Sequence, residues 1–273
     1  MSRVEDAKMR REEPSPLLLA IDVGNTNIVL GVFRGEQLVA DWRISTSGDT
    51  MPDEYAVLLS NLLGYHQLTM AGLDDAIIAS VVPKVTANLL EMLEKYMKVG
   101  ALVVGPGIDT GVRIAIDNPK EVGADRVVNG LAAYRLYGGP AVVIDLGTTT
   151  TFDAVSASGE YLGGAIAPGI LTSVEAMSRY TARLPRVDLV RPQHAIGRDT
   201  LSAMQSGIIL GHAAMVEGMV RRISTELGGE PRVIATGGLC GVIAAEVPLI
   251  QVADKNLTLR GLQLMYDLNR PRA

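Results

Sequence analysis

Two segments with the same residue types stand in the two halves of the chain: residues 22–26 (Asp-Val-Gly-Asn-Thr) and residues 145–149 (Asp-Leu-Gly-Thr-Thr). Each follows an apolar run and precedes a second apolar or β-prone run, so each is expected to form the tip of a β-hairpin. The glycine permits a tight turn, and the small hydroxyl residues leave the N–H groups of the turn open to an anion. The aspartate beside each turn can hold a cation. Two copies in one chain indicate two similar lobes that close on a phosphate chain, and hence nucleotide-dependent phosphoryl transfer.

One such tip alone would also fit an ordinary hairpin with a polar turn, because short glycine-containing turns are common. The repetition after two separate apolar runs favours the phosphate-binding interpretation. The sequence contains neither the Walker pattern GxxxxGK[ST] nor a kinase-type GxGxxG loop, so neither of these phosphate-binding loops competes with it.

A third candidate is the segment Gly123-Ala124-Asp125-Arg126, which stands where a helix is expected to begin. The free N–H groups and the dipole of a first helical turn favour anions. Asp125 could accept a hydrogen bond from an alcohol and orient it, and Arg126 could clamp a carboxylate or phosphate with its planar fork. Acidic residues are also common in first turns, so the spacing alone favours an ordinary helix start.

Two further segments allow a functional and a structural interpretation. Residues 236–238 (Thr-Gly-Gly) follow a β-rich run and could approach an adenosine closely, or could form a tight strand–helix turn. Residues 196–200 precede a long helical pattern, and Asp199 or Thr200 could be its N-cap.

The hydrophobic periodicity predicts the elements that would position these residues. The first half reads as three strands, a helix, a strand, a helix and a strand, at residues 17–23, 28–34, 37–44, 53–63, 76–82, 84–98 and 101–104. A helix at 124–137 follows, and the second half then restarts the order with strands at 141–146, 150–156 and 160–166, helices at 170–180 and 198–226, strands at 232–235 and 249–252, and a helix at 257–268. This repetition predicts an α/β fold of two duplicated ribonuclease-H-like lobes with mixed sheets, at residues 17–138 and 139–270.

Composition excludes several classes of protein. The 273 residues carry a net charge of −5 and only 4 % aromatics, which argues against a nucleic-acid partner. The single cysteine, Cys240, excludes an intramolecular disulfide and suits a reducing compartment. The first sixteen residues are charged and are expected to form a disordered tail rather than a signal peptide. The chain has no apolar run of the ~18 residues that a membrane span requires, so we expect a cytoplasmic protein.

Nine short motifs occur in a fixed order along the chain: DVGNTN (22–27), SVVP (80–83), NPKEVGADR (118–126), DLGTTTTFD (145–153), APGI (167–170), LPRV (184–187), IGRDT (196–200), QSGI (205–208) and ATGGL (235–239). With these motifs the chain resembles type III pantothenate kinases, members of the actin/hexokinase-like ATPase superfamily, from about residue 17 to 268. The resemblance implies ATP-dependent phosphorylation of pantothenate to 4′-phosphopantothenate, the first step of coenzyme A biosynthesis.

The resemblance also implies roles for individual residues. Asp125 would accept the proton of the substrate hydroxyl, and Asp145 would bind a monovalent cation, K⁺ or NH₄⁺, with Mg²⁺ accompanying the nucleotide. The ATP contacts would be Asp22, Val23, Gly24, Asn25, Thr26, Asn27, Ile28, Val29 and Thr148. The pantothenate contacts would be Ile116, Gly123, Ala124, Asp125, Arg126 and Thr200. Family members are typically homodimers with the pantothenate pocket near the dimer interface.

The sequence departs from the family pattern at two positions. Ile116 stands where a tyrosine is usual, which makes the expected substrate pocket more apolar, and Thr149 stands where alanine is usual. Two alternative functions stay open. One is a kinase for another small hydroxylated acid or a sugar. The other is an ATP-binding accessory factor without kinase activity, like the Bvg accessory factor proteins of this family.

Overall fold

The computed structural model of the chain describes residues 16–180 and 187–270. The predicted disordered tail at residues 1–16 therefore lies outside the described residues except for Pro16, and so does the motif at 184–187 except for Val187. Within the described part of the chain, no helix is long and apolar enough to cross a membrane.

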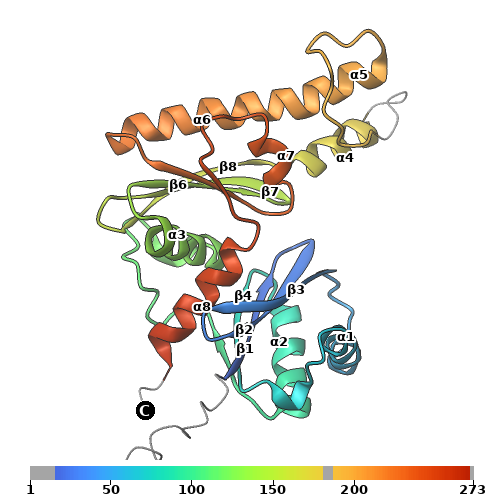
Figure 1. The fold of residues 1–273 in the computed structure, drawn as a ribbon, viewed down its shortest axis with the longest axis vertical. Helices are drawn as coiled ribbons and strands as arrows, with labels where there is room; N and C mark the ends of the chain where they lie inside the picture. Colours follow the sequence, from blue (N-terminus) through green and yellow to red (C-terminus); the bar gives the residue numbers. More distant parts are fainter. Residues whose placement is uncertain (1–15, 181–186, 271–273) are drawn as a thin grey trace, which may run out of the picture.

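The first lobe is built on a five-stranded mixed sheet with the order β3-β2-β1-β4-β5. Strands β1 (Leu17–Val23), β2 (Asn27–Arg34) and β3 (Gln37–Ser45) form an antiparallel meander. Strands β4 (Asp75–Ser80) and β5 (Ala101–Val103) add in parallel beside β1. Helix α1 (Pro52–Gly64) and helix α2 (Pro83–Met92), with its π-helical continuation Leu93–Met97, cover one face of this sheet (Figure 1).

The second lobe repeats this arrangement with a five-stranded sheet of order β10-β9-β6-β7-β8. Strands β6 (Ala141–Leu146), β7 (Thr149–Val155) and β8 (Tyr161–Pro168) form the second antiparallel meander. Strands β9 (Arg232–Thr236) and β10 (Val252–Ala253) pair in parallel beside β6. Read from the meander outwards, the two sheets have the same strand order and the same directions. The predicted duplication of an α/β lobe is therefore confirmed.

One face of the second sheet packs against α6 (Gly211–Leu227), and α7 (Cys240–Ala244) lies beside it (Figure 1). Helices α4 (Ile170–Tyr180) and α5 (Thr200–Gln205) lie on an arm beyond this lobe. A π-helical segment, Ser206–Leu210, joins α5 to α6, so the single long helix predicted at 198–226 is divided into three parts. The last predicted strand is shorter than expected and lies at Val252–Ala253.

Helices α3 (Ala124–Tyr137) and α8 (Leu257–Asn269) fill the space between the two sheets (Figure 1). Leu259, Leu262 and Met265 of α8 pack on the inner face of the first sheet, although α8 follows the second sheet in the chain. Ala132 and Ala133 of α3 pack on the inner face of the second sheet. The two helices approach closely at Gly261, where a Cβ would meet the backbone carbonyl of Val128. Each lobe is thus joined to the other through its apolar core.

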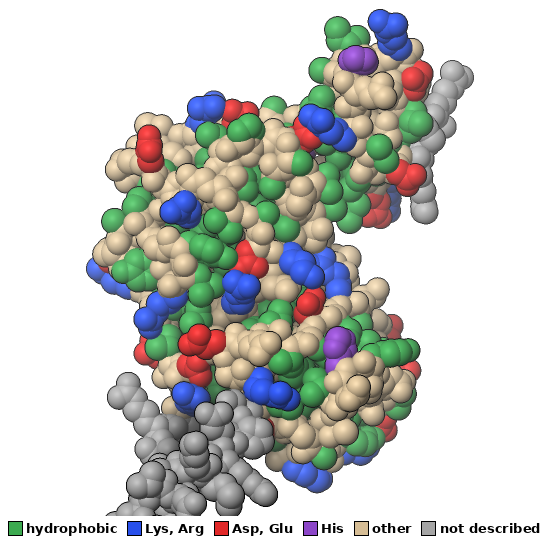
Figure 2. Space-filling model, in the orientation of Figure 1, with side chains coloured by type: hydrophobic (Ala, Val, Ile, Leu, Met, Phe, Trp, Pro, Cys, Tyr) green, Lys and Arg blue, Asp and Glu red, His purple; other side chains and the backbone are tan. Residues whose placement is uncertain are grey.

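Figure 2 shows the molecular surface hollowed between the arm that carries α4 and α5 and the first lobe. Acidic and basic side chains lie close together across the middle of this face. The division of the chain into lobes at residues 17–138 and 139–270 stays a prediction, because α3 and α8 contribute to the cores on both sides of that boundary.

Candidate active site

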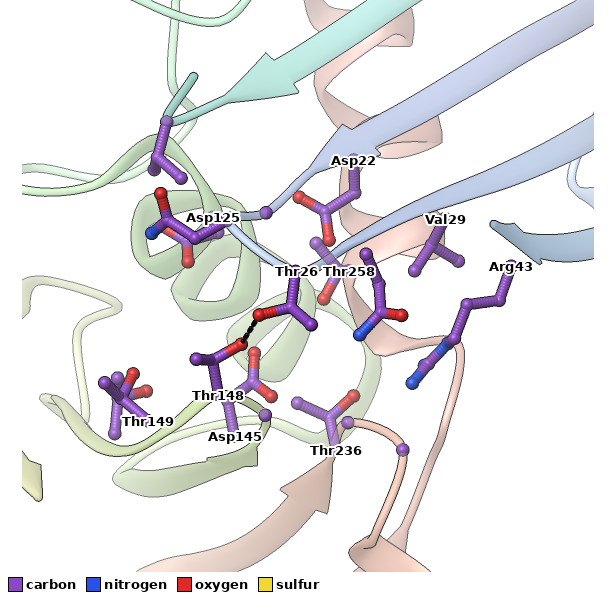
Figure 3. Close-up of a pocket in the computed structure, with 18 of the residues that line it drawn as sticks. Asp22, Thr26, Val29, Arg43, Asp125, Asp145, Thr148, Thr149, Thr236 and Thr258 are labelled. Carbon is purple, nitrogen blue, oxygen red and sulfur yellow. Dashed lines mark hydrogen bonds between the residues drawn. The ribbon is translucent and has the colours of Figure 1, made fainter. Parts of the chain in front are cut away.

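The two predicted hairpin tips face each other across a cavity of about 140 Å³ between the lobes (Figure 3). The residues that line it come from both hairpins, from β3 and the residue after β4, from the start of α3, from the turn after β9 and from the start of α8. They are Asp22, Gly24, Asn25, Thr26, Asn27, Val29, Arg43, Val81, Asp125, Asp145, Gly147, Thr148, Thr149, Thr151, Thr236, Gly237, Gly238, Lys255, Thr258 and Leu259. We call this cavity the interlobe pocket.

The first hairpin turn is held by hydrogen bonds that leave its tip facing the pocket. The Gly24 N–H donates to the Asn27 carbonyl at 2.9 Å, and the Thr46 hydroxyl donates to the Gly24 carbonyl at 2.7 Å. Within the described residues, no hydrogen bond occupies the N–H of Asn25. A turn of this kind offers its backbone N–H groups to an anion.

The second hairpin turn is fixed in a similar way by Gly169, which follows β8, and by the first turn of α4. The Gly169 N–H and the Thr172 hydroxyl both donate to the Thr148 carbonyl, at 3.1 and 2.6 Å. A Cβ at Gly169 would overlap the carbonyl oxygens of Gly147 and Thr148, so only glycine allows this close approach. The hydroxyls of Thr148 and Thr149 remain on the pocket side (Figure 3).

A single hydrogen bond joins the two tips across the pocket. The hydroxyl oxygens of Thr26 and Thr148 lie 2.8 Å apart, although 122 positions separate them in the chain (Figure 3). Both side chains are exposed to solvent, so a phosphate oxygen can replace either partner at little cost. These two threonines, one from each hairpin tip, therefore mark the place where both hairpins can contact one phosphate chain.

Three carboxylates from different elements line the same pocket: Asp22 at the end of β1, Asp145 at the end of β6 and Asp125 in the first turn of α3 (Figure 3). Burial, together with the charges of Asp125 and Asp145, raises the pKa of Asp22 to about 8. Burial, together with the charges of Asp125 and Asp153, raises the pKa of Asp145 to about 7. Arg43 opposes both shifts. The pocket is therefore short of positive charge, which a bound cation would supply.

Asp145 is held by a short chain of hydrogen bonds from the two central helices. The side-chain amide nitrogen of Asn129 on α3 donates to the Asp145 carboxylate at 3.3 Å, and the Thr258 hydroxyl of α8 donates to the side-chain oxygen Oδ1 of Asn129 at 2.8 Å. Because Asn129 is buried, this contact fixes one carboxylate oxygen of Asp145 while the rest of the group faces the pocket.

The donor set around Asp145 fits a cation that prefers oxygen ligands. Thr236 pairs with Asp145 in adjacent strands, and its buried hydroxyl has no hydrogen-bond partner within the described residues. An unpaired buried hydroxyl beside a carboxylate can serve as a further oxygen ligand to a bound cation. No group of three or more His, Cys, Asp and Glu side chains in the described chain could hold a metal ion. A Mg²⁺ bound mainly through nucleotide phosphates and water needs only one or two carboxylates, so Asp22 and Asp125 fit that ion as well.

The next residue, Arg126, does not line the pocket and is paired with Asp153 of the second lobe. Its Nε donates to Asp153 at 2.7 Å, and Asp153 also accepts the Tyr161 hydroxyl at 2.8 Å and the Thr151 hydroxyl at 3.2 Å. Burial raises the pKa of Asp153 to about 6, while Arg126 and these hydroxyl donors limit the shift. The Nη2 nitrogen of Arg126 is buried without a hydrogen-bond partner in the described chain.

Not all predicted site residues lie at the pocket. Val23 and Ile28 are fully buried in the first core, so they support the hairpin rather than face a ligand. Ile116 lies against Gly163 of β8, and a Cβ there would be 3.3 Å from its Cγ2. Gly123, Ala124 and Arg126 flank Asp125 but do not line the pocket. Thr200 begins α5 on the arm and is exposed.

Several pocket residues were not predicted as site residues. Arg43 and Lys255 are the two basic residues among those that line the pocket in the described part of the chain. A Cβ at Gly238 would overlap the Arg43 guanidinium, which reaches across from the first lobe. Lys255 makes an ion pair of 3.5 Å with Asp41, also across the lobes. Neither residue belongs to a recognisable local motif. By contrast, the Thr-Gly-Gly turn at 236–238 follows a β-rich run and was a candidate ligand contact from the sequence. It does lie at the pocket.

Duplicated lobes, paired hairpins and carboxylates at the ends of their first strands define a protein with the actin/hexokinase-like ATPase fold. Known structures bear out the fold. A protein of Campylobacter jejuni described as a Baf family transcriptional activator superposes with a TM-score of 0.57 at 20 % identity, covering 91 % of this chain and 97 % of that one. A ROK hexokinase of Thermus thermophilus superposes with a TM-score of 0.50 at 15 % identity, covering 91 % and 98 %.

Sequence comparison then identifies the family. The family model described as type III pantothenate kinase matches residues 18–222. A type III pantothenate kinase of Moorella thermoacetica is 51 % identical over 253 residues, which cover 93 % of this chain and all of the relative. The chain belongs to the type III pantothenate kinase family.

Proposed function

We propose that the interlobe pocket transfers the γ-phosphoryl group of ATP to the 4′-hydroxyl of pantothenate, which is the first step of coenzyme A biosynthesis. The observation that carries the proposal is the meeting of both hairpin tips and three carboxylates at one cavity in a member of this kinase family. Relatives with similar sequences are named for pantothenate kinase activity. Kinases of this kind use ATP together with Mg²⁺.

The first hairpin is proposed to bind the ATP phosphates. Its tip presents Gly24, Asn25, Thr26 and Asn27 to the pocket, and Thr148 meets it from the other lobe. Backbone N–H groups and hydroxyls are the donors that a triphosphate needs. Asp22 and Val29 line the same space, whereas Val23 and Ile28 act by holding the strands in register. Bound Mg²⁺ would supply charge neutralisation of the phosphates, and Asp22 is a carboxylate of the pocket that could hold it.

Asp125 is proposed to accept the proton of the pantothenate hydroxyl. It is the only carboxylate at the pocket that a described helix start provides, and it lies opposite the two hairpin tips (Figure 3). A carboxylate there can orient the hydroxyl towards the phosphate chain and take its proton as the new P–O bond forms. The chemistry then needs positioning and charge stabilisation from the hairpins rather than a covalent intermediate.

Arg126, with Gly123 and Ala124, is proposed to bind the rest of pantothenate. The unpaired Nη2 nitrogen of Arg126 suits the carboxylate of this substrate. Ile116, at the edge of β8, would offer an apolar contact in place of the usual tyrosine hydroxyl. Thr200 is on the arm of the same chain and does not line the pocket. Its proposed contact with pantothenate therefore requires movement of the arm or a second copy of the chain.

Asp145 is proposed to bind K⁺ or NH₄⁺, with the Thr236 hydroxyl as a second oxygen. The unpaired Thr236 hydroxyl and the raised pKa of Asp145 support this proposal. A bound monovalent cation would supply positive charge beside the ATP phosphates. Asn129 keeps the carboxylate of Asp145 oriented for that role.

A homodimer is proposed as the assembly. Leu162 and Ile166 on the edge strand β8 and Leu171 at the start of α4 are exposed apolar side chains, with exposed fractions of 40 %, 64 % and 57 %. Residues 113–115 pair with this sheet edge at Tyr161, and the exposed apolar side chains beyond that point are what a protein–protein contact covers. This edge is next to Ile116, which would bring the interface close to the pantothenate contacts. A cytoplasmic location also stays a prediction.

The experiment that tests the proposed function is ADP release from the purified chain with Mg²⁺ and K⁺ present. The acceptors are pantothenate, a panel of sugars, acetate and a control without acceptor. We expect ADP above the control with pantothenate and not with the other acceptors. A stronger response to a sugar or another hydroxy acid would identify a different kinase. No response to any acceptor, with ATP still bound, would favour an accessory factor without kinase activity.

A further inference from the structure

A buried carboxylate, Asp153, lies under the start of α3 on the inner face of the second sheet. Val143 and Val155, its neighbours on that face, belong to an apolar cluster that packs on α3. Asp153 itself has no exposed surface. Burying an ionisable group in such a place costs free energy unless it is paired. Its presence there therefore calls for a role that an apolar residue could not fill.

The contacts of Asp153 all serve to fix one guanidinium. Arg126 Nε donates to Oδ1 at 2.7 Å, the Tyr161 hydroxyl donates to the same oxygen at 2.8 Å, and the Thr151 hydroxyl donates to Oδ2 at 3.2 Å. The Arg126 guanidinium also lies over the Tyr161 ring, with Cζ 5.9 Å from the ring centroid. Hydroxyls from two strands thus hold the carboxylate, and the carboxylate holds the arginine.

The arginine is left only partly paired by this arrangement. A carboxylate can accept from Nε and Nη2 of one arginine at once. Here the second oxygen of Asp153 accepts from Thr151 instead, and Nη2 remains buried without a partner among the described residues. A buried N–H group without a partner is costly, so its retention indicates a ligand that completes it. Arg126 directly follows Asp125, which lines the pocket.

We infer that Asp153, supported by Tyr161 and Thr151, is a positioning residue that holds Arg126 by its Nε and leaves the Nη2 end of the guanidinium for the carboxylate of the acceptor substrate. This inference rests on the proposed function, because it takes pantothenate as that acceptor. It adds a specificity device: the network selects acceptors that carry an anionic group at a fixed distance from the reacting hydroxyl. Arg126 held in this way does not lose side-chain freedom when the substrate binds.

The alternative is that the Arg126–Asp153 pair only fastens α3 to the second sheet. The variant Asp153→Asn keeps the shape of the side chain and removes the charge that holds the Nε. If the pair is merely structural, this change should affect stability and all substrates alike. If Asp153 positions Arg126, the loss should fall on the KM for an acceptor with a carboxylate.

The test measures kcat and KM for Asp153→Asn with pantothenate, with a neutral amide of pantothenate as acceptor, and with ATP. We expect the KM for pantothenate to rise about tenfold to a hundredfold, the range for one hydrogen bond to a charged group, with kcat nearly unchanged. The KM values for the neutral amide and for ATP should stay within about threefold of wild type. Because the amide lacks the carboxylate that Arg126 binds, we expect it to be a poor acceptor for the wild type. Its low kcat/KM should therefore change little in Asp153→Asn.

Asp75→Asn is the matched control. Asp75 on β4 also accepts a hydrogen bond from a tyrosine hydroxyl, that of Tyr266, but it lies away from the interlobe pocket. This variant should lose stability without any change in the KM for pantothenate. Tyr161→Phe is the milder probe if Asp153→Asn does not fold. It keeps the ring beside Arg126 and removes one bond to Asp153, so the KM for pantothenate should rise about twofold to tenfold.

The outcomes separate this inference from the proposed function. A parallel rise in KM for pantothenate and for the neutral amide would overturn the positioning role, as would an Asp153→Asn enzyme with the KM of wild type. A wild-type chain that does not phosphorylate pantothenate would overturn the proposed function and this inference with it. As a further check, Arg126→Lys should raise the KM for pantothenate much less in the Asp153→Asn background than in wild type, because the two residues act as one unit.

Discussion

Replacing Asp125 with asparagine should have opposite effects on activity and stability. The asparagine keeps the size of the side chain and its place in the first turn of α3, but it cannot take the proton of the acceptor hydroxyl. Turnover should fall by about two to four decades, the range for a lost general base. ATP binding should change little, because the hairpin tips that are proposed to hold the phosphates are untouched.

The gain in stability follows from the charges around Asp125. Its carboxylate is among the causes that raise the pKa of Asp22 to about 8 and that of Asp145 to about 7. Above pH 8 both neighbours are ionised in the folded chain, so three negative charges repel one another and removing one of them stabilises the fold. Near pH 6 both neighbours hold their protons, and little repulsion remains to be relieved. We expect a gain of about 1 kcal/mol at pH 9 and almost none at pH 6, within the range of substitutions that relieve active-site strain.

The assay is thermal unfolding of wild type and Asp125→Asn at pH 6 and pH 9, in buffer without Mg²⁺, K⁺ or nucleotide, beside steady-state turnover of both proteins. Glu121→Gln is a matched control, because Glu121 is exposed and lies just before α3, outside the pocket. An Asp125→Asn protein that retains most of the wild-type rate would remove Asp125 from the mechanism. A change in Tm that is the same at both pH values would show that the carboxylates at the pocket do not repel one another as described.

Three further predictions concern the same pocket. K⁺ or NH₄⁺ should activate the wild type over Na⁺, and Asp145→Ala should be slow and indifferent to the ion supplied; a wild type equally fast with any ion, as measured by ADP release, would contradict the cation role. Asp22→Asn should weaken Mg²⁺-dependent ATP binding, measured by calorimetry with and without Mg²⁺, and an unchanged Mg²⁺ dependence would argue against it. Gly169→Ala should destabilise the chain by about 1–3 kcal/mol through overlap with the Thr148 carbonyl and raise the KM for ATP; a denaturation curve and a KM like those of wild type would show that the second hairpin tolerates displacement.

The repeated hairpins could be predicted because their signals are local. Glycine and small hydroxyl residues between apolar runs determine a hairpin turn within a few residues, and the structure places both turns where the sequence predicts them. The helix at 124–137 was predicted with the bounds that the structure shows, because its start and its end also have local signals. The restart of the pattern after this helix sufficed to predict two lobes of the same strand order.

The positions of Arg43 and Lys255 at the pocket could not be predicted, because they depend on how the lobes pack. Arg43 is one basic residue in an alternating strand, and nothing in its neighbourhood tells which end of the sheet faces the other lobe. Lys255 reaches the pocket because α8 crosses from the second lobe to the inner face of the first sheet. Asp153 was part of a recognised motif, but its pairing with Arg126 joins a strand to a helix that precedes it in the chain.

The π-helical segments that divide the long helices could not be predicted from the sequence pattern either. The predicted helices at 84–98 and 198–226 each contain a π-helical segment, Leu93–Met97 and Ser206–Leu210. Both segments keep a helical hydrophobic pattern, so the periodicity does not distinguish them from α-helix. The hydrophobic pattern therefore does not mark where each helix changes its turn.

The most direct test of the central claim is the mass of pantothenate after incubation with the purified chain, ATP, Mg²⁺ and K⁺. We predict that pantothenate gains one phosphoryl group with the wild type and that Asp125→Asn yields almost none over the same time while still binding ATP. Pantothenate recovered unmodified from the wild-type reaction, or ADP formed without a phosphorylated acceptor, would contradict the claim that the two hairpins and Asp125 form the active site of a pantothenate kinase.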